Sequence, residues 1–239
     1  MLTNRQIKTL ATKLQTTEHN IAQEYCQHVF LSIFYQQPDS EQVFFKGGTA
    51  LRIIFNSPRF SEDLDFSSQL PSRQLQKLLK TTLKKMSNFG LNPELQEAKS
   101  TSGGFLAIFS CSLAGLLLRL QIEISGRAKK KLAGEIFTIN PDYLPAYTLL
   151  SLKTENLVAE KIQAALNRQK PRDFFDIYFL LRSRLISPRQ KKNLEKIKTQ
   201  LKKTNRNFSA ELKQFLPISY QPLIKNFSQT LQREIKRNI

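Results

Sequence analysis

The chain has 239 residues, of which 40% are hydrophobic, so it can bury a core as one large domain or two small ones. It carries 37 Lys and Arg against 19 Asp and Glu, a formal net charge of +18, which favours a polyphosphate partner such as RNA or DNA over a neutral metabolite. No apolar run is long enough to span a membrane, and the two cysteines, Cys26 and Cys111, lack the spacing of metal ligands. We therefore expect a soluble, cytoplasmic protein with reduced cysteines in its core.

Residues 3–35 are predicted to form one helix, because apolar side chains recur there every three or four positions. The two histidines of the chain, His19 and His28, both lie within it at a separation that points them to different faces. We expect both to be surface or capping residues rather than catalytic ones.

The next segment is predicted to run from a short strand at residues 43–45, through a turn at Gly47 and Gly48, into a helix that starts at Thr49. Glycine can adopt positive φ and leaves room for a ligand to approach the backbone closely. Since the first N–H groups of a helix have no partners within it, Gly47, Gly48 and Thr49 are candidates for holding the phosphate oxygens of a nucleotide.

Two carboxylates follow on a predicted second strand. Asp63 and Asp65 are two residues apart, so both side chains leave the same face while Leu64 and Phe66 face the core. At ~3.3 Å per residue the two positions lie about 7 Å apart, and the two charges repel each other unless a cation sits between them. Carboxylate and phosphate oxygens are ligands of Mg²⁺, which predicts a metal site. The alternative is a tight turn followed by an edge strand with solvated acids.

A second helix is predicted over residues 71–89, where leucines line one face and lysines the other. Its lysines are expected to be solvated, with RNA contact as the alternative; they are Lys77, Lys80, Lys84 and Lys85.

Two strands are predicted at residues 105–109 and 116–125, separated by Ala114-Gly115. In the second strand apolar and polar residues alternate, and Glu123 falls on the polar face. This strand is a candidate neighbour of the strand that carries Asp63 and Asp65. The alternative for Glu123 is a solvated glutamate.

Pro141 and Pro145 mark a linker, which predicts a first domain over residues 1–140 and a helical, basic second domain over residues 141–239. In the second domain one helix is predicted at residues 157–166 and another after Pro171, with Asp173 as its N-cap. Residues 187–239 contain 13 Lys and Arg against 3 Glu, and they are predicted to form amphipathic helices with basic faces.

Three strings of residues resemble a known family. Residues 46–52 read Lys-Gly-Gly-Thr-Ala-Leu-Arg, residues 59–66 read Arg-Phe-Ser-Glu-Asp-Leu-Asp-Phe, and residues 168–176 read Arg-Gln-Lys-Pro-Arg-Asp-Phe-Phe-Asp. Over about residues 28–186 the chain resembles the AbiEii/AbiGii toxin nucleotidyltransferases of the polymerase-β-like superfamily. The resemblance implies an α+β fold, in which a mixed sheet flanked by helices forms the catalytic core and a helical C-terminal half follows.

The resemblance also implies roles for particular residues. Asp63, Asp65 and Glu123 would ligate Mg²⁺ or Mn²⁺, and Glu123 would act near the attacking hydroxyl as ligand or general base. Lys161 would contact the triphosphate, with Asp176 positioning the site; a lysine there suits phosphoryl transfer because a fixed cation offsets the growing charge. The remaining nucleotide-binding candidates are Gly47, Gly48, Thr49, Arg52 and Ser61. Supporting or RNA-contacting candidates are Arg59, Arg168, Lys170, Arg172 and Asp173. The alternatives are a solvated Lys161 and an Asp173 that only caps its helix.

The function implied by this resemblance is that of a toxin from a toxin–antitoxin or phage-defence system. It would transfer a nucleoside monophosphate from an NTP to an RNA, with the tRNA 3′ end as the expected acceptor, and so block translation. A cognate antitoxin is the expected protein partner. Two other classes remain open: nucleotidyl transfer to a hydroxyl of a protein or small molecule, and a non-catalytic module that binds RNA or a partner.

Overall fold

The computed structural model describes residues 1–127 and 132–239. Its internal contacts divide the chain into an N-terminal unit, Met1–Asn56 with Phe60–Leu152, and a C-terminal unit, Ser57–Arg59 with Lys153–Ile239. The division falls after Leu152 rather than at the proline-containing segment after residue 140. The reason is that strand β7 (Tyr147–Leu152) pairs with two other strands of the N-terminal unit, β1 and β6.

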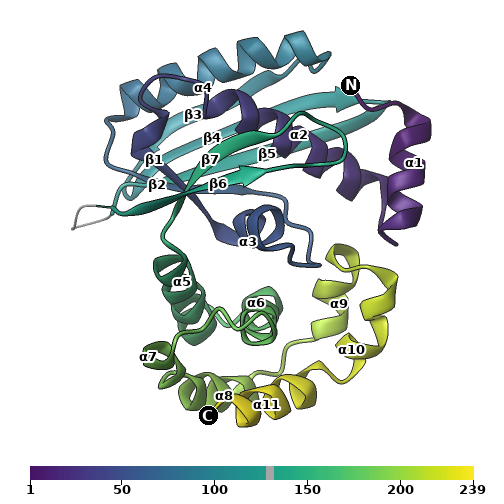
Figure 1. Cartoon of the computed structure of the whole chain (residues 1–239), viewed down its shortest axis with the longest axis vertical. Coiled ribbons are helices and arrows are strands. Elements are labelled where there is room, and N and C mark those ends of the chain that lie inside the picture. Colours follow the sequence, from purple (N-terminus) through teal and green to yellow (C-terminus); the bar gives the residue numbers. More distant parts are fainter. Residues whose placement is uncertain (128–131) are drawn as a thin grey trace. The chain divides into compact units, whose positions relative to one another are not determined.

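In the described part of the chain, seven strands form one mixed sheet with the order β3-β4-β5-β2-β1-β7-β6 (Figure 1). The neighbours β2 and β5, and β1 and β7, run parallel, and the other pairs are antiparallel. The strands are β1 Val43–Lys46, β2 Leu64–Ser68, β3 Glu94–Thr101, β4 Gly104–Leu113, β5 Leu116–Ser125, β6 Gly134–Ile139 and β7 Tyr147–Leu152.

The two strands predicted on either side of Ala114-Gly115 are confirmed as β4 and β5, and they pair as a hairpin. Ala114 and Gly115 form its two-residue turn with φ of 54° and 82°, the positive values that tight hairpin turns require. Alternate residues of β5 are buried, among them Leu120, Ile122 and Ile124, as the sequence pattern predicts. Strands β3, β6 and β7 were not predicted.

The helices of the N-terminal unit are α1 Asn4–Lys13, α2 Glu18–Phe34, α3 Gly47–Phe55 and α4 Ser72–Met86. The prediction of one helix over residues 3–35 is wrong. Gln15 has φ of 53°, which ends α1, and the Thr17 side chain accepts a hydrogen bond from the Asn20 N–H to start α2. Helix α4 is confirmed, with its leucines buried and its lysines exposed.

Helix α2 packs its aromatic side chains on the sheet, where Phe30 stacks with Phe109 and Phe34 contacts Phe66. Figure 1 shows α4 above the sheet and α3 below it. Cys26 of α2 and Cys111 of β4 are buried free thiols whose Sγ atoms lie 3.1 Å apart, in agreement with their prediction as core residues.

The two histidines have different environments. His19 is exposed, as predicted. His28 is buried, contrary to the prediction of a surface or capping role, because it faces the sheet and shares a 2.8 Å hydrogen bond between its Nδ1 and the hydroxyl of Tyr147. Burial lowers the pKa of His28 to about 4, so its imidazole is neutral at pH 7.

The C-terminal unit is helical, as predicted. Its core contains a ring cluster in which Phe175 of α6 stacks on Phe227 of α11. Asp173 does not cap α6 from the N-cap position, because that position is Lys170; its carboxylate lies in the first turn and accepts the Lys170 N–H at 3.0 Å. The helices are α5 Thr154–Asn167, α6 Pro171–Arg182, α7 Pro188–Lys191, α8 Leu194–Lys203, α9 Phe208–Leu212, α10 Gln221–Lys225 and α11 Phe227–Asn238. None of the helices in residues 1–127 and 132–239 has the length and apolarity needed to span a bilayer.

Candidate active site

Strand β2 separates apolar from acidic side chains. Leu64 and Phe66 are fully buried, and Phe66 contacts Phe34 of α2, whereas Asp65 between them is half-buried on the opposite face. Asp63 precedes the strand instead of lying in it, because β2 begins at Leu64. The predicted alternation therefore holds for Asp65, while the backbone of Asp63 depends on contacts outside the strand ladder.

Glu123 lies on the strand next to Asp65. Strands β2 and β5 are parallel neighbours, and the Cα partner of Asp65 is Glu123. Adjacent strands are about 4.8 Å apart, so the two residues start from neighbouring positions on one face of the sheet. The carboxylate of Glu123 is exposed and accepts a hydrogen bond from Gln121 Nε2 at 2.6 Å along its own strand.

The glycine turn lies directly against Asp65. Gly47 has φ of +84°, and a Cβ on it would fall 2.0 Å from Asp65 Oδ2. Only a residue without a side chain fits there, so the carboxylate occupies the space over the turn. Helix α3 begins at Gly47, two residues earlier than predicted, and its first N–H groups therefore belong to Gly47, Gly48 and Thr49.

Side chains hold the segment that carries Asp63. The Thr49 hydroxyl is buried and donates to the Asp63 carbonyl at 2.5 Å. From α2, Gln27 Nε2 donates to the carbonyls of Ser61 and Glu62, and Gln23 Nε2 donates to the carbonyl of Glu62. The sequence analysis missed both glutamines. The signal that could have found them is two amides four residues apart, which places both side chains on one face of the helix.

A hollow of about 340 Å³ opens beside the two carboxylates on the face that carries them. Cationic side chains line it together with the acids: Lys46, whose Cα pairs with that of Asp65, and Arg127 after the end of β5. Arg127 was not predicted as a site residue, because an isolated arginine after a strand has no distinguishing pattern.

Arg52 lines a different hollow of about 510 Å³, together with His28 and Glu24. Its Nε lies 2.5 Å from Glu24 Oε2, and its guanidinium carbon lies 4.0 Å from the centroid of the Phe60 ring. These contacts give Arg52 a place in the packing of α2 against α3. Its predicted contact with a nucleotide stays a prediction, as does that of the half-buried Ser61, whose carbonyl is held by Gln27.

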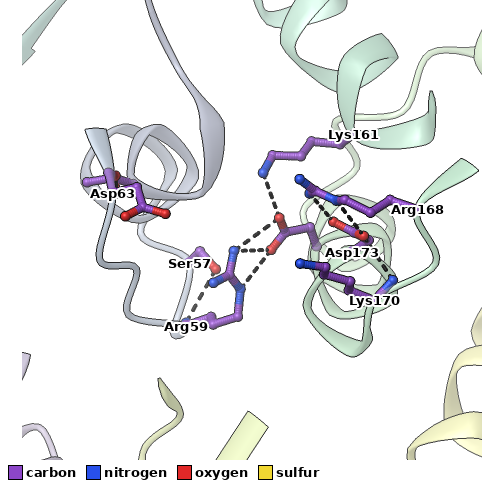
Figure 2. A network of polar contacts seen from close by, with 9 residues as sticks. Ser57, Arg59, Asp63, Lys161, Arg168, Lys170 and Asp173 are labelled. Atoms are coloured by element: carbon purple, nitrogen blue, oxygen red, sulfur yellow. Dashed lines mark hydrogen bonds and ion pairs between the residues drawn. The ribbon is translucent and has the colours of Figure 1, made fainter. Parts of the chain in front are cut away.

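The C-terminal unit contains a buried ionic cluster. Arg59 donates to Asp176 through Nε to Oδ1 at 2.9 Å and through Nη2 to Oδ2 at 3.1 Å, and Lys161 Nζ lies 2.7 Å from Oδ2 (Figure 2). Asp176 is 1% exposed. Burial raises the pKa of Asp176, but the charges of Arg59 and Lys161 outweigh burial and lower it, so the carboxylate is ionised. Two cations around one anion leave the cluster with a net positive charge.

A second cluster surrounds the start of α6. Asp173 accepts hydrogen bonds from the Arg168 guanidinium and from the Lys170 N–H (Figure 2). Half of the Arg168 side chain is exposed, and Arg172 is half-buried. The helix-capping alternative for Asp173 thus has a direct structural basis, and contact of the neighbouring cations with RNA stays a prediction.

The carboxylates of this face supply only some of the ligands that a hard divalent cation needs. In residues 1–127 and 132–239, no three His, Cys, Asp or Glu side chains gather closely enough to hold a metal ion. Mg²⁺, however, normally takes one or two carboxylates and completes its shell with substrate phosphates and water. Asp65 against the Gly47 turn, with Asp63 two residues before it, supplies that set. The residues fit a metal that arrives with a nucleotide.

A mixed sheet flanked by helices, followed by a helical unit, is the fold of a polymerase-β-like nucleotidyltransferase. Two solved structures share it: MenT4, a nucleotidyltransferase toxin of Mycobacterium tuberculosis H37Rv (TM-score 0.67, 14% identity, 99% of this chain and 90% of the other), and JHP933 of Helicobacter pylori (TM-score 0.60, 20% identity, 93% and 95%). No curated protein matches the chain. The family model described as nucleotidyl transferase AbiEii toxin, type IV toxin–antitoxin system, matches residues 29–238.

The chain therefore belongs to the AbiEii family of nucleotidyltransferase toxins. The match corrects one expectation from the sequence. The resemblance was expected to stop near residue 186, but the family model continues through the basic C-terminal helices. These helices are part of the family's architecture and not an unrelated tail. The family also implies an antitoxin partner.

Proposed function

We propose that this toxin transfers a nucleoside monophosphate from an NTP to the 3′ end of tRNA in an Mg²⁺-dependent reaction, and so blocks translation in the cytoplasm. One observation carries the proposal. Asp65 stands in register with Glu123 on the adjacent parallel strand and lies against the Gly47 turn, so two carboxylates lie beside the start of helix α3, whose first N–H groups we propose as the phosphate-binding groups.

We assign the following roles in the proposed reaction. Asp63 and Asp65 would hold Mg²⁺, which offsets charge on the phosphates and stabilises the attacking and leaving oxygens. The N–H groups at the start of α3 would bind phosphate oxygens. The 3′ oxygen of the acceptor bonds to the α-phosphorus, the bond to the β-phosphate oxygen breaks, and pyrophosphate leaves. Glu123 would take the proton from the acceptor hydroxyl.

The ionic cluster of the C-terminal unit supports a role for Lys161 at the triphosphate. Its Nζ is held 2.7 Å from Asp176 Oδ2, and Asp176 is fixed in turn by Arg59. A cation that is already oriented stabilises developing phosphate charge without reorganisation. Asp176 would serve as the positioning residue for this cation.

The charge of the chain supports RNA as the acceptor. The chain has a net charge of +18, and residues 187–239 contain 13 Lys and Arg but only 3 Glu. This charge favours binding of a polyanion. Exposed cations of this segment include Lys202, Lys203 and Arg206. A small neutral acceptor would not require them.

The test is incubation of the protein with each labelled NTP, total tRNA and Mg²⁺. Wild type is expected to label tRNA, Asp65→Asn to lose the activity, and Glu62→Gln, which changes an exposed carboxylate nearby, to keep it. Chelation of the metal should abolish labelling. Equal incorporation by wild type and Asp65→Asn would refute the proposal. Label found on a protein or on a small hydroxyl compound instead of tRNA would show that the acceptor belongs to that class.

A further inference from the structure

Asp63 lies outside the strand ladder, and its backbone is held by side chains on both sides. The peptide before it ends in the Glu62 carbonyl, which accepts from Gln27 Nε2 at 2.9 Å and from Gln23 Nε2 at 3.2 Å. The peptide after it begins with the Asp63 carbonyl, which accepts from Thr49. Because both flanking peptide groups are fixed, the direction in which the Asp63 carboxylate leaves the backbone is fixed as well.

Both amide hydrogens of each glutamine are donated to backbone carbonyls. Gln27 uses its second hydrogen on the Ser61 carbonyl at 2.8 Å, and Gln23 uses its second on the carbonyl of Arg119 in β5 at 3.0 Å. Gln23 therefore ties the segment before Asp63 to the strand that carries Glu123. A flipped amide would place oxygen against these carbonyls, so the orientation is set by the contacts themselves.

Gln23 makes this link at a cost to folding. Its Oε1 is buried and has no hydrogen-bond partner among the described residues, and the side chain is 4% exposed. A buried polar atom without a partner destabilises a fold, and a leucine would avoid it. Such a destabilising atom is expected where the hydrogen bonds of its side chain support a functional site rather than the packing of the core.

We infer that Gln23 and Gln27 are positioning residues for the metal-binding carboxylate Asp63, acting from α2 through the backbone of residues 61–63. The inference rests on the proposed function of Asp63 as a metal ligand. Partners that orient a ligand change metal affinity about 10–100-fold when removed, without touching the metal. The two amides share the Glu62 carbonyl, so the loss of either should loosen the same peptide group.

The experiment compares Gln27→Met with Gln37→Met. Gln37 is a matched control, because it is also buried and its Nε2 donates at 2.9 Å to a backbone carbonyl, that of Ile33 at the end of α2. Binding of Mn²⁺ with a non-hydrolysable NTP analogue is followed by electron paramagnetic resonance. Gln27→Met should weaken Mn²⁺ binding about 10–100-fold, and Gln37→Met should leave it within about twofold, even where both lower Tm.

Hydrogen exchange of the peptide covering residues 60–66 gives a second readout that needs no activity. Exchange there should rise in Gln27→Met and stay unchanged in Gln37→Met. Unchanged Mn²⁺ affinity in a folded Gln27→Met protein overturns the inference. If wild type binds no Mn²⁺ and labels no acceptor, the proposed function fails, and unchanged exchange in Gln27→Met would then overturn the positioning role separately.

Discussion

The carboxylate of Asp65 occupies the space that a side chain at Gly47 would need. A Cβ on Gly47 would lie 2.0 Å from Asp65 Oδ2 and 2.7 Å from Asp65 Cγ. The two residues come from different elements, the start of α3 and the strand β2, and they meet because β1 and β2 pair so that Lys46, just before the glycine, stands opposite Asp65. The turn and the carboxylate are therefore one structural feature, and each sets the position of the other.

Gly47→Ala is expected to reduce nucleotidyl transfer about 100-fold, the cost typical of a reacting group displaced by ~1 Å. The positive φ would add strain of about 1–2 kcal/mol. Gly115→Ala is the matched control, because Gly115 has φ of +82° with nothing within 4 Å of its Cβ position. Urea unfolding and labelling assays of both variants separate the two effects. Similar activity in the two variants would show that the contact with Asp65 does not matter.

Glu123→Gln is expected to lower kcat about 100-fold or more while KM for the NTP changes only a few-fold, since a general base contributes about 10²–10⁴-fold. Glu94→Gln, at an exposed position at the start of β3, should be neutral. The measurement is the dependence of the initial rate on NTP concentration for each variant. A Glu123→Gln protein with wild-type kcat would show that Glu123 is a solvated glutamate without a role in the reaction.

Asp176→Ala is expected to lower the free energy of unfolding by about 3–5 kcal/mol, because it leaves the charges of Arg59 and Lys161 buried without an anion. Asp173→Ala should cost less, about 1 kcal/mol, because Arg168 then turns to solvent and only one helix-start hydrogen bond is lost. Urea denaturation at pH 7 compares them. An Asp176→Ala protein as stable as Asp173→Ala would contradict the cluster's structural role.

His28 should make the fold sensitive to mild acid. Its pKa is about 4 in the folded protein against 6.5 for the free side chain, so the unfolded chain binds more protons between these values. The stabilisation is present above pH 6.5 and is lost as the pH falls towards 4, by at most about 3 kcal/mol. His28→Gln should lack this component. The measurement is the free energy of unfolding of both proteins from pH 4 to 7, and parallel curves would contradict the prediction.

The sequence predicted those parts of the fold that depend on neighbouring residues. The two strands around the Gly47 turn, the β4–β5 hairpin at Ala114-Gly115 and helix α4 all follow from local alternation, periodicity and turn residues. The break between α1 and α2 was not predicted because the apolar periodicity continues past Gln15, and nothing in the local sequence marks the positive φ of that residue.

The supporting residues of the site could not be predicted in the same way. Gln27 reaches Ser61 across 34 positions, and Arg59 reaches Asp176 across 117 positions. Such contacts depend on how elements pack, and no spacing in the sequence encodes them. The sequence named the strands of Asp65 and Glu123 as candidate neighbours, because each carries its acid on a polar face. The register that pairs the two residues depends on how the strands align, and only the structure gives it.

The chain passes between its two units more than once. Ser57–Arg59 belongs with Lys153–Ile239, although the residues on either side belong to the N-terminal unit. A fragment that starts at Lys153 would therefore keep Asp176 and Lys161 but lack the guanidinium that binds the same carboxylate. Expression of residues 153–239 alone should yield an unstable product. A version in which the segment around Arg59 is fused ahead of Lys153 should fold more stably, because it restores the missing guanidinium.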